Sequence, residues 1–108
     1  MMADGADISV QDLHSLLERK EKVVLLDVRE PHEYAFVHLE ATLIPLGQLA
    51  SRYGELDPSR EIVVYCHHGI RSRHAVELLK RAGFPHVRNL EGGIDAWSRV
   101  VDPGLPRY

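Results

Sequence analysis

The single cysteine of the chain, Cys66, lies where an apolar segment changes into a polar one. The sequence IVVYCHHGIRS over residues 62–72 places two histidines, a glycine and an isoleucine between Cys66 and Arg71. A thiol is a nucleophile only as its thiolate, and its pKa falls below about 8.5 beside cations or at a helix N-terminus. A helix that begins near Arg71 would direct unpaired N–H groups and its positive dipole end towards Cys66. This spacing predicts a nucleophilic cysteine in an anion-binding loop.

Residues 67–70 favour a compact loop of backbone hydrogen-bond donors. Gly69 permits a tight turn, in which successive N–H groups converge and bind an anion or the anionic sulfur of a modified cysteine. Five side chains near the loop would add positive charge: His67, His68, Arg71, Arg73 and His74. For the two histidines after Cys66 a second interpretation stays open, that of solvated loop residues.

Alternating strands and helices are predicted to position this loop. Continuous apolar runs at 22–28 and 61–66 are typical of strands buried on both faces of a parallel sheet, and shorter strands are predicted at 41–46 and 86–90. Ligands of such sheets bind beyond the carboxyl ends of the strands. One strand is followed by Asp27 and Arg29 and another ends at Cys66, so we expect all three residues at one rim.

Helices are predicted between and around these strands. They cover residues 9–20, 29–36, 46–56, 71–82 and 92–100, and an irregular tail runs from about residue 99 to residue 108. Ser9 is predicted to cap the first helix, with Asp12 three positions later. Leu49 and Tyr53 are predicted to face the core, and Gly83 to cap the C-terminus of the fourth helix.

Composition narrows the classes of protein to which the chain can belong. A length of 108 residues is that of one domain, and a net charge of −3 without a basic stripe argues against nucleic acid as the main partner. One cysteine cannot form an internal disulfide, which fits a reducing compartment. The first residues lack the features of a secretion signal, and no apolar run approaches the roughly 20 residues of a membrane helix. We therefore expect a cytoplasmic protein without membrane partners.

Four segments carry a resemblance to a known family. CHHGIRS after a buried strand resembles the active-site loop of the rhodanese-like sulfurtransferases, and LLDVREPHEY, VHLEATLIPL and NLEGGIDAW resemble other landmarks of that family in their usual order. The resemblance extends from about Ile8 to Trp97. It implies a single rhodanese domain over residues 1–108, of class α/β, with a central, mainly parallel five-stranded sheet and helices on both faces.

The resemblance also implies roles for individual residues. Cys66 would be the catalytic nucleophile that carries sulfur as a persulfide. The loop that binds the outer sulfur and the donor would consist of His67, His68, Gly69, Ile70 and Arg71. Asp27, Arg29 and Ser72 would support the rim, and a purely structural ion pair of Asp27 with Arg29 stays open as a second interpretation. No cofactor is implied, and a metal site is not expected, because zinc sites combine spaced ligand pairs and the chain has no second cysteine.

Several functions remain open at this point. A sulfurtransferase would take sulfur from a small donor such as thiosulfate and pass it to cyanide or a cellular thiol. A carrier module would instead work in a protein sulfur relay for cofactor or tRNA thiolation, and the tail VDPGLPRY resembles the end of rhodanese domains fused to adenylyltransferases. A non-catalytic binding domain is a third alternative. Phosphatase relatives have a loop one residue longer, so the Cys-x4-Arg spacing favours sulfur.

One segment departs from the family pattern. In VHLEAT, Val37 occupies a position that is commonly glycine, and a second glycine is missing. Because glycine permits backbone conformations that valine resists, we expect a rebuilt connection before the third strand.

Overall fold

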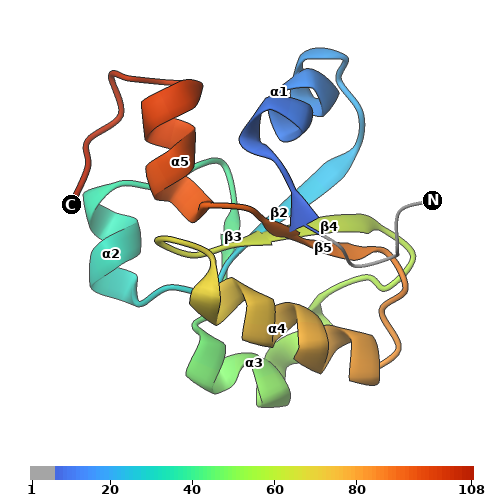
Figure 1. Ribbon diagram of the computed structural model, residues 1–108. Coiled ribbons are helices and arrows are strands. Elements are labelled where there is room, and N and C mark those ends of the chain that lie inside the picture. The colour runs from blue at the N-terminus through green and yellow to red at the C-terminus, as the bar shows by residue number, and fades with distance from the viewer. Residues whose placement is uncertain (1–6) are drawn as a thin grey trace.

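Five parallel strands form the centre of the molecule in a computed structural model that describes residues 7–108 (Figure 1). The strands are β1 (Asp7–Ile8), β2 (Val23–Asp27), β3 (Thr42–Leu43), β4 (Glu61–Tyr65) and β5 (Val87–Leu90). They lie in the order β1-β5-β4-β2-β3, and every neighbouring pair is parallel. The predicted parallel sheet is thereby confirmed.

Helices cover both faces of this sheet. They are α1 (Val10–Glu18), α2 (Pro31–Phe36), α3 (Leu46–Arg52), α4 (Ile70–Arg81) and α5 (Gly93–Val100), with a 3-10 turn, η1 (Tyr53–Glu55), after α3. Figure 1 shows α1 and α5 on one face, α3 and α4 on the other, and α2 at one end of the sheet beside the C-terminal end of the chain. The layers predicted from the alternation of strands and helices are confirmed.

The two central strands divide their side chains between two cores, because successive residues of a strand point to opposite faces. On the side of α3 and α4, Leu26 and Val64 pack with Leu79 of α4. On the side of α1 and α5, Leu25 and Val63 pack with Trp97 of α5. This double burial explains the continuous apolar runs in the two strands, Val23–Leu26 in β2 and Ile62–Tyr65 in β4.

Helix ends follow the predicted capping residues. The Ser9 hydroxyl accepts a hydrogen bond from the Asp12 N–H at 3.0 Å, which satisfies one of the free donors of the first turn of α1. Gly83 follows α4 with a φ of +98°, the left-handed conformation that glycine adopts at helix C-termini. Both caps were predicted and are confirmed.

The structure differs from the sequence-based expectations in three places. Strand β1 was not predicted, because two residues carry no recognisable periodicity. Tyr53 was predicted to face the core but lies in η1, 37% exposed, with its ring against the edge of Phe84. The helix predicted over residues 92–100 ends at Val100 as expected, and the tail therefore begins at Val101, slightly later than the expected start at about residue 99.

The altered VHLEAT segment is accommodated without a glycine. Val37 has φ −159° and ψ +138°, which is extended backbone that any residue adopts. Its side chain is buried, and its carbonyl oxygen accepts a hydrogen bond of 2.7 Å from Arg29. Among the described residues, no helix is both long enough and apolar enough to cross a membrane.

Candidate active site

The ends of β2 and β4 form the base of the candidate site. The sheet register pairs Asp27 with Tyr65, so that Val28 and Cys66 follow adjacent strands at the same edge. Helix α4 then begins at Ile70. Residues 66–69 are therefore a short loop between a strand end and a helix start, as the sequence predicted.

The thiol of Cys66 lies inside this loop and is surrounded by hydrogen-bond donors. Its Sγ accepts the N–H groups of Gly69 at 3.1 Å and Ser72 at 3.4 Å, and it lies 3.3 Å from the Ser72 hydroxyl. Gly69 has a φ of +110°, a conformation that a side chain would strain. Cys66 is only 2% exposed, so a reactant can reach the sulfur only through the opening of the loop.

Two opposing effects act on the pKa of the Cys66 thiol. Burial raises this pKa, whereas the hydrogen bonds from the Ser72 hydroxyl and from the backbone of Ser72, Gly69 and His68 lower it. The hydrogen bonds prevail, and the pKa falls below its ordinary value. A thiolate is the nucleophilic form of cysteine, so the loop favours the reactive state of this residue.

A side chain of the neighbouring strand holds the Ser72 hydroxyl in place. Ser72 Oγ donates to Asn89 Oδ1 at 2.5 Å, and the amide nitrogen of Asn89 donates to the Gly69 carbonyl at 3.4 Å. A hydroxyl has one hydrogen, so Ser72 Oγ accepts from the thiol while it donates to Asn89, and it can donate to the sulfur only in place of that bond. Asn89 thus connects β5 to the loop, a role that the sequence did not reveal.

Helix α5 binds the other side of the loop. The N–H groups of Ile94 and Asp95 donate to the carbonyls of Cys66 and His67 at 2.9 and 3.1 Å. Gly93, with a φ of +62°, lies so close that a Cβ atom there would overlap these two carbonyl oxygens. The glycines of EGGIDAW therefore do more than connect a strand to a helix, because they let α5 approach the back of the reactive loop.

Arg71 contacts an acidic side chain that was not predicted to belong to the site. Its two terminal guanidinium nitrogens bind the Glu33 carboxylate of α2 at 2.7 and 3.0 Å. Glu33 also accepts the Glu30 N–H at 2.9 Å and the Tyr108 hydroxyl at 2.9 Å. The hydrogen bond from Arg71 is the main cause that lowers the pKa of Glu33 to about 2, so the carboxylate is ionised at neutral pH and balances the charge of Arg71.

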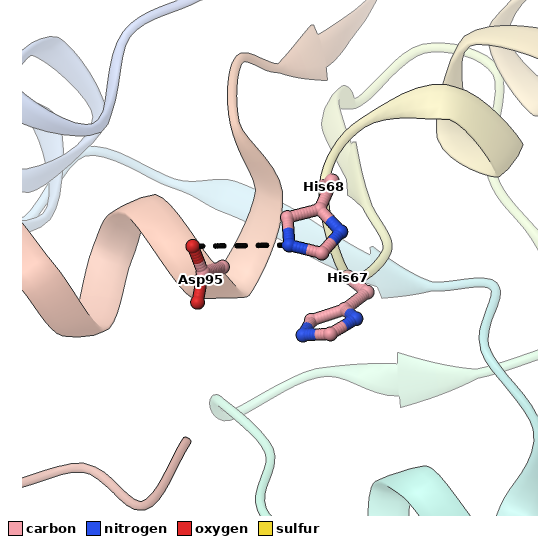
Figure 2. Close-up of side chains that lie close together, drawn as sticks. All are labelled: His67, His68 and Asp95. Atoms are coloured by element: carbon pink, nitrogen blue, oxygen red, sulfur yellow. Dashed lines mark ion pairs between the residues drawn. The ribbon is translucent and has the colours of Figure 1, made fainter. Parts of the chain in front are cut away.

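The two histidines of the loop lie between Asp95 and Tyr108. The His67 ring stacks on the Tyr108 ring, with 3.8 Å between the ring centroids and 6° between the ring planes. The His68 ring is tilted against the His67 ring, with 3.9 Å between their centroids. Figure 2 shows the His68 ring facing Asp95, 3.8 Å from nitrogen to oxygen, with His67 beside it. Burial and the neighbouring His68 lower the pKa of His67, so His67 adds little positive charge at neutral pH.

His67, His68 and Asp95 also place one possible metal-binding atom each within 4.8 Å of the others. Both carboxylate oxygens of Asp95 are already bound by guanidinium groups, Arg99 at 3.1 Å and Arg107 at 3.2 Å. A metal ion at this position would have to displace these cations. The three residues are therefore better described as part of a network of ion pairs that joins the loop to α5 and the tail.

Asp27 and Arg29 lie beneath the rim as an ion pair, which is the second interpretation that the sequence left open. Both side chains are fully buried, and they are joined by an ion pair of 2.7 Å. Arg29 also donates to the Val37 carbonyl at 2.7 Å and to the Tyr108 hydroxyl at 2.8 Å. The guanidinium thus connects β2 to the segment before β3 and to the tail.

Three residues near the loop were missed in the sequence: Glu33, Asn89 and Tyr108. Each acts through a partner far away in the chain, so no local pattern identifies it. The one available signal was the resemblance of the tail to those of rhodanese domains in larger proteins. Ile70, by contrast, was assigned to the loop and lies at its opening with 71% of its surface exposed.

Comparison with known proteins adds independent information. Residues 9–100 match the family described as Rhodanese-like domain. The chain is 38% identical over 98% of its length to the protein named Probable adenylyltransferase/sulfurtransferase MoeZ of Mycobacterium tuberculosis, and 37% identical over 93% of its length to a protein named Sulfurtransferase of Allochromatium vinosum. It covers 92% of the second protein. The crystal structure of a rhodanese-related protein from Thermoplasma volcanium superimposes with a TM-score of 0.80, with 32% identity, 94% of this chain covered and 95% of that chain.

Several relatives are much longer than this chain. The chain spans only 28% of the MoeZ protein and 25% of a relative in Arabidopsis thaliana named Adenylyltransferase and sulfurtransferase MOCS3. The similarity therefore concerns one domain of these larger proteins.

Proposed function

The chain belongs to the family of rhodanese-like domains, which its residues 9–100 match, and from this premise we propose that it transfers a sulfane sulfur through a persulfide on Cys66. The observation that carries the proposal is the set of hydrogen-bonding groups around Sγ: two backbone N–H donors within 3.4 Å and the Ser72 hydroxyl at 3.3 Å. These groups stabilise a negative charge at the sulfur before and after the transfer.

The chemistry needs no external oxidant or reductant. The Cys66 thiolate attacks the outer sulfur of the donor, the new S–S bond forms at Sγ, and the S–S bond of the donor breaks with its electron pair on the leaving group. Thiosulfate would leave as sulfite. A nucleophilic acceptor, such as cyanide or a cellular thiol, then attacks the outer sulfur of the persulfide, and Cys66 leaves as a thiolate.

The other loop residues have supporting parts in this proposal. The backbone of residues 67–71 binds the outer sulfur, Arg71 lies at the opening in its ion pair with Glu33, and Ser72 holds the thiolate. The buried pair of Asp27 and Arg29 supports the base of the site. These roles follow from the contacts of each group, because none of these side chains is in a position to replace Cys66 as nucleophile.

A second candidate function is that of a carrier domain in a protein sulfur relay. It is favoured by the names of the longer relatives, which combine adenylyltransferase with sulfurtransferase. In that case the persulfide would be loaded by a partner protein and would be formed slowly or not at all by small donors. The chemistry at Cys66 would be the same, and only the identity of donor and acceptor would differ.

The proposal is tested by measuring the intact mass of the reduced protein before and after exposure to thiosulfate, and again after cyanide. We expect a gain of one sulfur that cyanide removes. Cys66→Ser should fold normally and show no gain, because the thiolate is the only nucleophile that the mechanism uses. Appreciable sulfur transfer by Cys66→Ser would contradict the mechanism, whereas loading of the wild type only by a persulfide-bearing protein would favour the relay.

A further inference from the structure

The charge at the opening of the Cys66 loop is unusual for a site that would accept thiosulfate. Arg71 directly precedes Ser72, whose N–H group binds Sγ together with that of Gly69. Both terminal nitrogens of its guanidinium are occupied by Glu33. A dianion that approaches the loop therefore meets an ion pair with no net charge.

Glu33 is firmly held in this position. Its side chain is only 10% exposed, and its two oxygens accept hydrogen bonds from Arg71, from the Glu30 N–H and from the Tyr108 hydroxyl. Four hydrogen bonds to one carboxylate, two of them from the ionised guanidinium of Arg71, make its displacement by an incoming anion unfavourable. Glu33 takes two of the five N–H donors of Arg71, so a sulfonate group that binds the remaining donors also meets the negative charge of this carboxylate.

The surface next to Glu33 is suited to a different chemical group. His32, Glu33, Phe36 and Tyr108 line a shallow, mainly apolar hollow. Phe36 is 55% exposed and its ring lies 5.9 Å from that of Tyr108, edge to face. Tyr108 in turn stacks on His67, the residue after Cys66. An organic group attached to the leaving sulfur of a donor can therefore lie in this hollow while the outer sulfur reaches Cys66.

We propose that Glu33 and the hollow beside it determine donor specificity, so that the site prefers organic sulfane-sulfur donors with an uncharged apolar group over dianionic thiosulfate. The preferred class comprises organic persulfides and thiosulfonates. The inference rests on the proposed function of Cys66 and adds the substrate class. In the transfer step, Sγ bonds to the outer sulfur of the thiosulfonate, whose S–S bond breaks with the electron pair on a sulfinate. A persulfide donor would leave as a thiolate.

The test uses single-turnover loading of the reduced protein, followed by intact mass, with thiosulfate and methanethiosulfonate as donors. Glu33→Gln should increase the loading rate at low donor concentration about tenfold for thiosulfate and about threefold for methanethiosulfonate, because the removed repulsion scales with donor charge. The gain should lie in the apparent affinity for the donor and not in the limiting rate. It should shrink at high salt, which screens exposed charges.

Glu77→Gln is the matched control, because it removes the same charge from an exposed position of α4. It should change neither rate. Thermal unfolding of each variant shows whether it is folded at the assay temperature. Equal effects of Glu33→Gln on both donors, or a loss with thiosulfate, would overturn the role of Glu33.

Phe36→Ala tests the hollow separately. Benzenethiosulfonate should load this variant about fivefold more slowly than the wild type, because apolar contact is lost, and methanethiosulfonate should lose less, because its methyl group covers less of the hollow. An equal change for both donors would show that Phe36 does not contact the organic group and would overturn this part of the inference.

If no donor adds sulfur to the wild type, the proposed function fails and the inference with it. Sulfur addition with unchanged donor ratios in both variants overturns the inference alone.

Discussion

At the scale of single residues, the proposed chemistry depends on the pKa of the buried Cys66 thiol. Burial alone would raise the pKa of Cys66 above that of an exposed thiol and leave the side chain unreactive. The hydrogen bonds from Ser72, Gly69 and His68 reverse that effect on its pKa. Reactivity is thus a property of the loop backbone and of one hydroxyl, and it does not require a general base next to the sulfur.

Ser72→Ala tests this account through the pH dependence of sulfur loading. The loading rate rises with pH as Cys66 ionises, and the lowered pKa of the wild type places this rise below that of an ordinary thiol. Loss of the hydroxyl should move the rise to higher pH and reduce the rate at pH 7 roughly tenfold, since hydrogen bonds to charged groups contribute about 1.5–3 kcal/mol. Ser51→Ala, on the exposed side of α3, should leave the profile unchanged. A lower rate with an unshifted profile would contradict the role of Ser72.

Residues with local signals could be predicted from the sequence, and residues with distant partners could not. Cys66 and Gly69 stand in one short motif, and their arrangement follows from a strand end, a turn and a helix start. Glu33 binds Arg71 from 38 positions away, and Tyr108 binds Glu33 from 75 positions away. Such pairs depend on the order of the strands, which the sequence pattern does not specify.

At the scale of elements, two helices meet at the reactive loop. The start of α4 supplies the donors around Sγ, and the start of α5 binds the carbonyls on the other side of the same loop. The loop is therefore held between two helix N-termini. This arrangement requires the backbone of α5 to approach the backbone of the Cys66 loop closely. Only glycine permits this approach at position 93.

Gly93→Ala should destabilise the protein severely. A Cβ atom at this position would overlap the Cys66 and His67 carbonyl oxygens, and its φ of +62° disfavours alanine. We expect a loss of about 3 kcal/mol or more in the free energy of unfolding, measured by urea denaturation. Gly47→Ala is the matched control, because a Cβ there contacts nothing within 4 Å and the residue lies in α3. It should be neutral or stabilising by up to about 1 kcal/mol. Similar effects of the two variants would contradict the packing of α5 against the loop.

The elements themselves could be predicted where they are long or strongly apolar. Strands β2 and β4 and helix α4 have clear patterns, and their predicted positions are confirmed to within a few residues. The two-residue strand β1 and the turn η1 gave no such signal. Tyr53 was misplaced because the helical pattern of α3 was extended past Arg52, where the backbone tightens into η1.

At the scale of the whole molecule, the segment after α5 packs against the site. Tyr108 binds Arg29 and Glu33 and stacks on His67, and Arg107 binds Asp95 of α5. The segment after α5 looked irregular in the sequence and has no regular structure from Asp102 onwards. It nevertheless joins α2 and α5 to the base of the loop.

The free energy of unfolding should fall at acid pH as Glu33 becomes protonated. The folded protein lowers the pKa of Glu33 from 4.5 to about 2, mainly through Arg71. A carboxylate with a lowered pKa stabilises the fold fully above pH 4.5, and this contribution is lost as the pH falls towards 2. The difference in unfolding free energy between the wild type and Glu33→Gln should therefore be constant near neutral pH and shrink over this range. A difference that does not change with pH, measured by denaturation at a series of pH values, would contradict the ion pair.

The short outer strands restrict how another protein can recognise this domain. Within residues 7–108, strands β1 and β3 lie at the two edges of the sheet, and each has two residues. Recognition by strand addition needs a longer row of free backbone groups along an edge. Such short edges also offer little template for aggregation. Another chain that exchanges sulfur with Cys66 would accordingly be recognised through side chains around the loop opening, and not by extending the sheet.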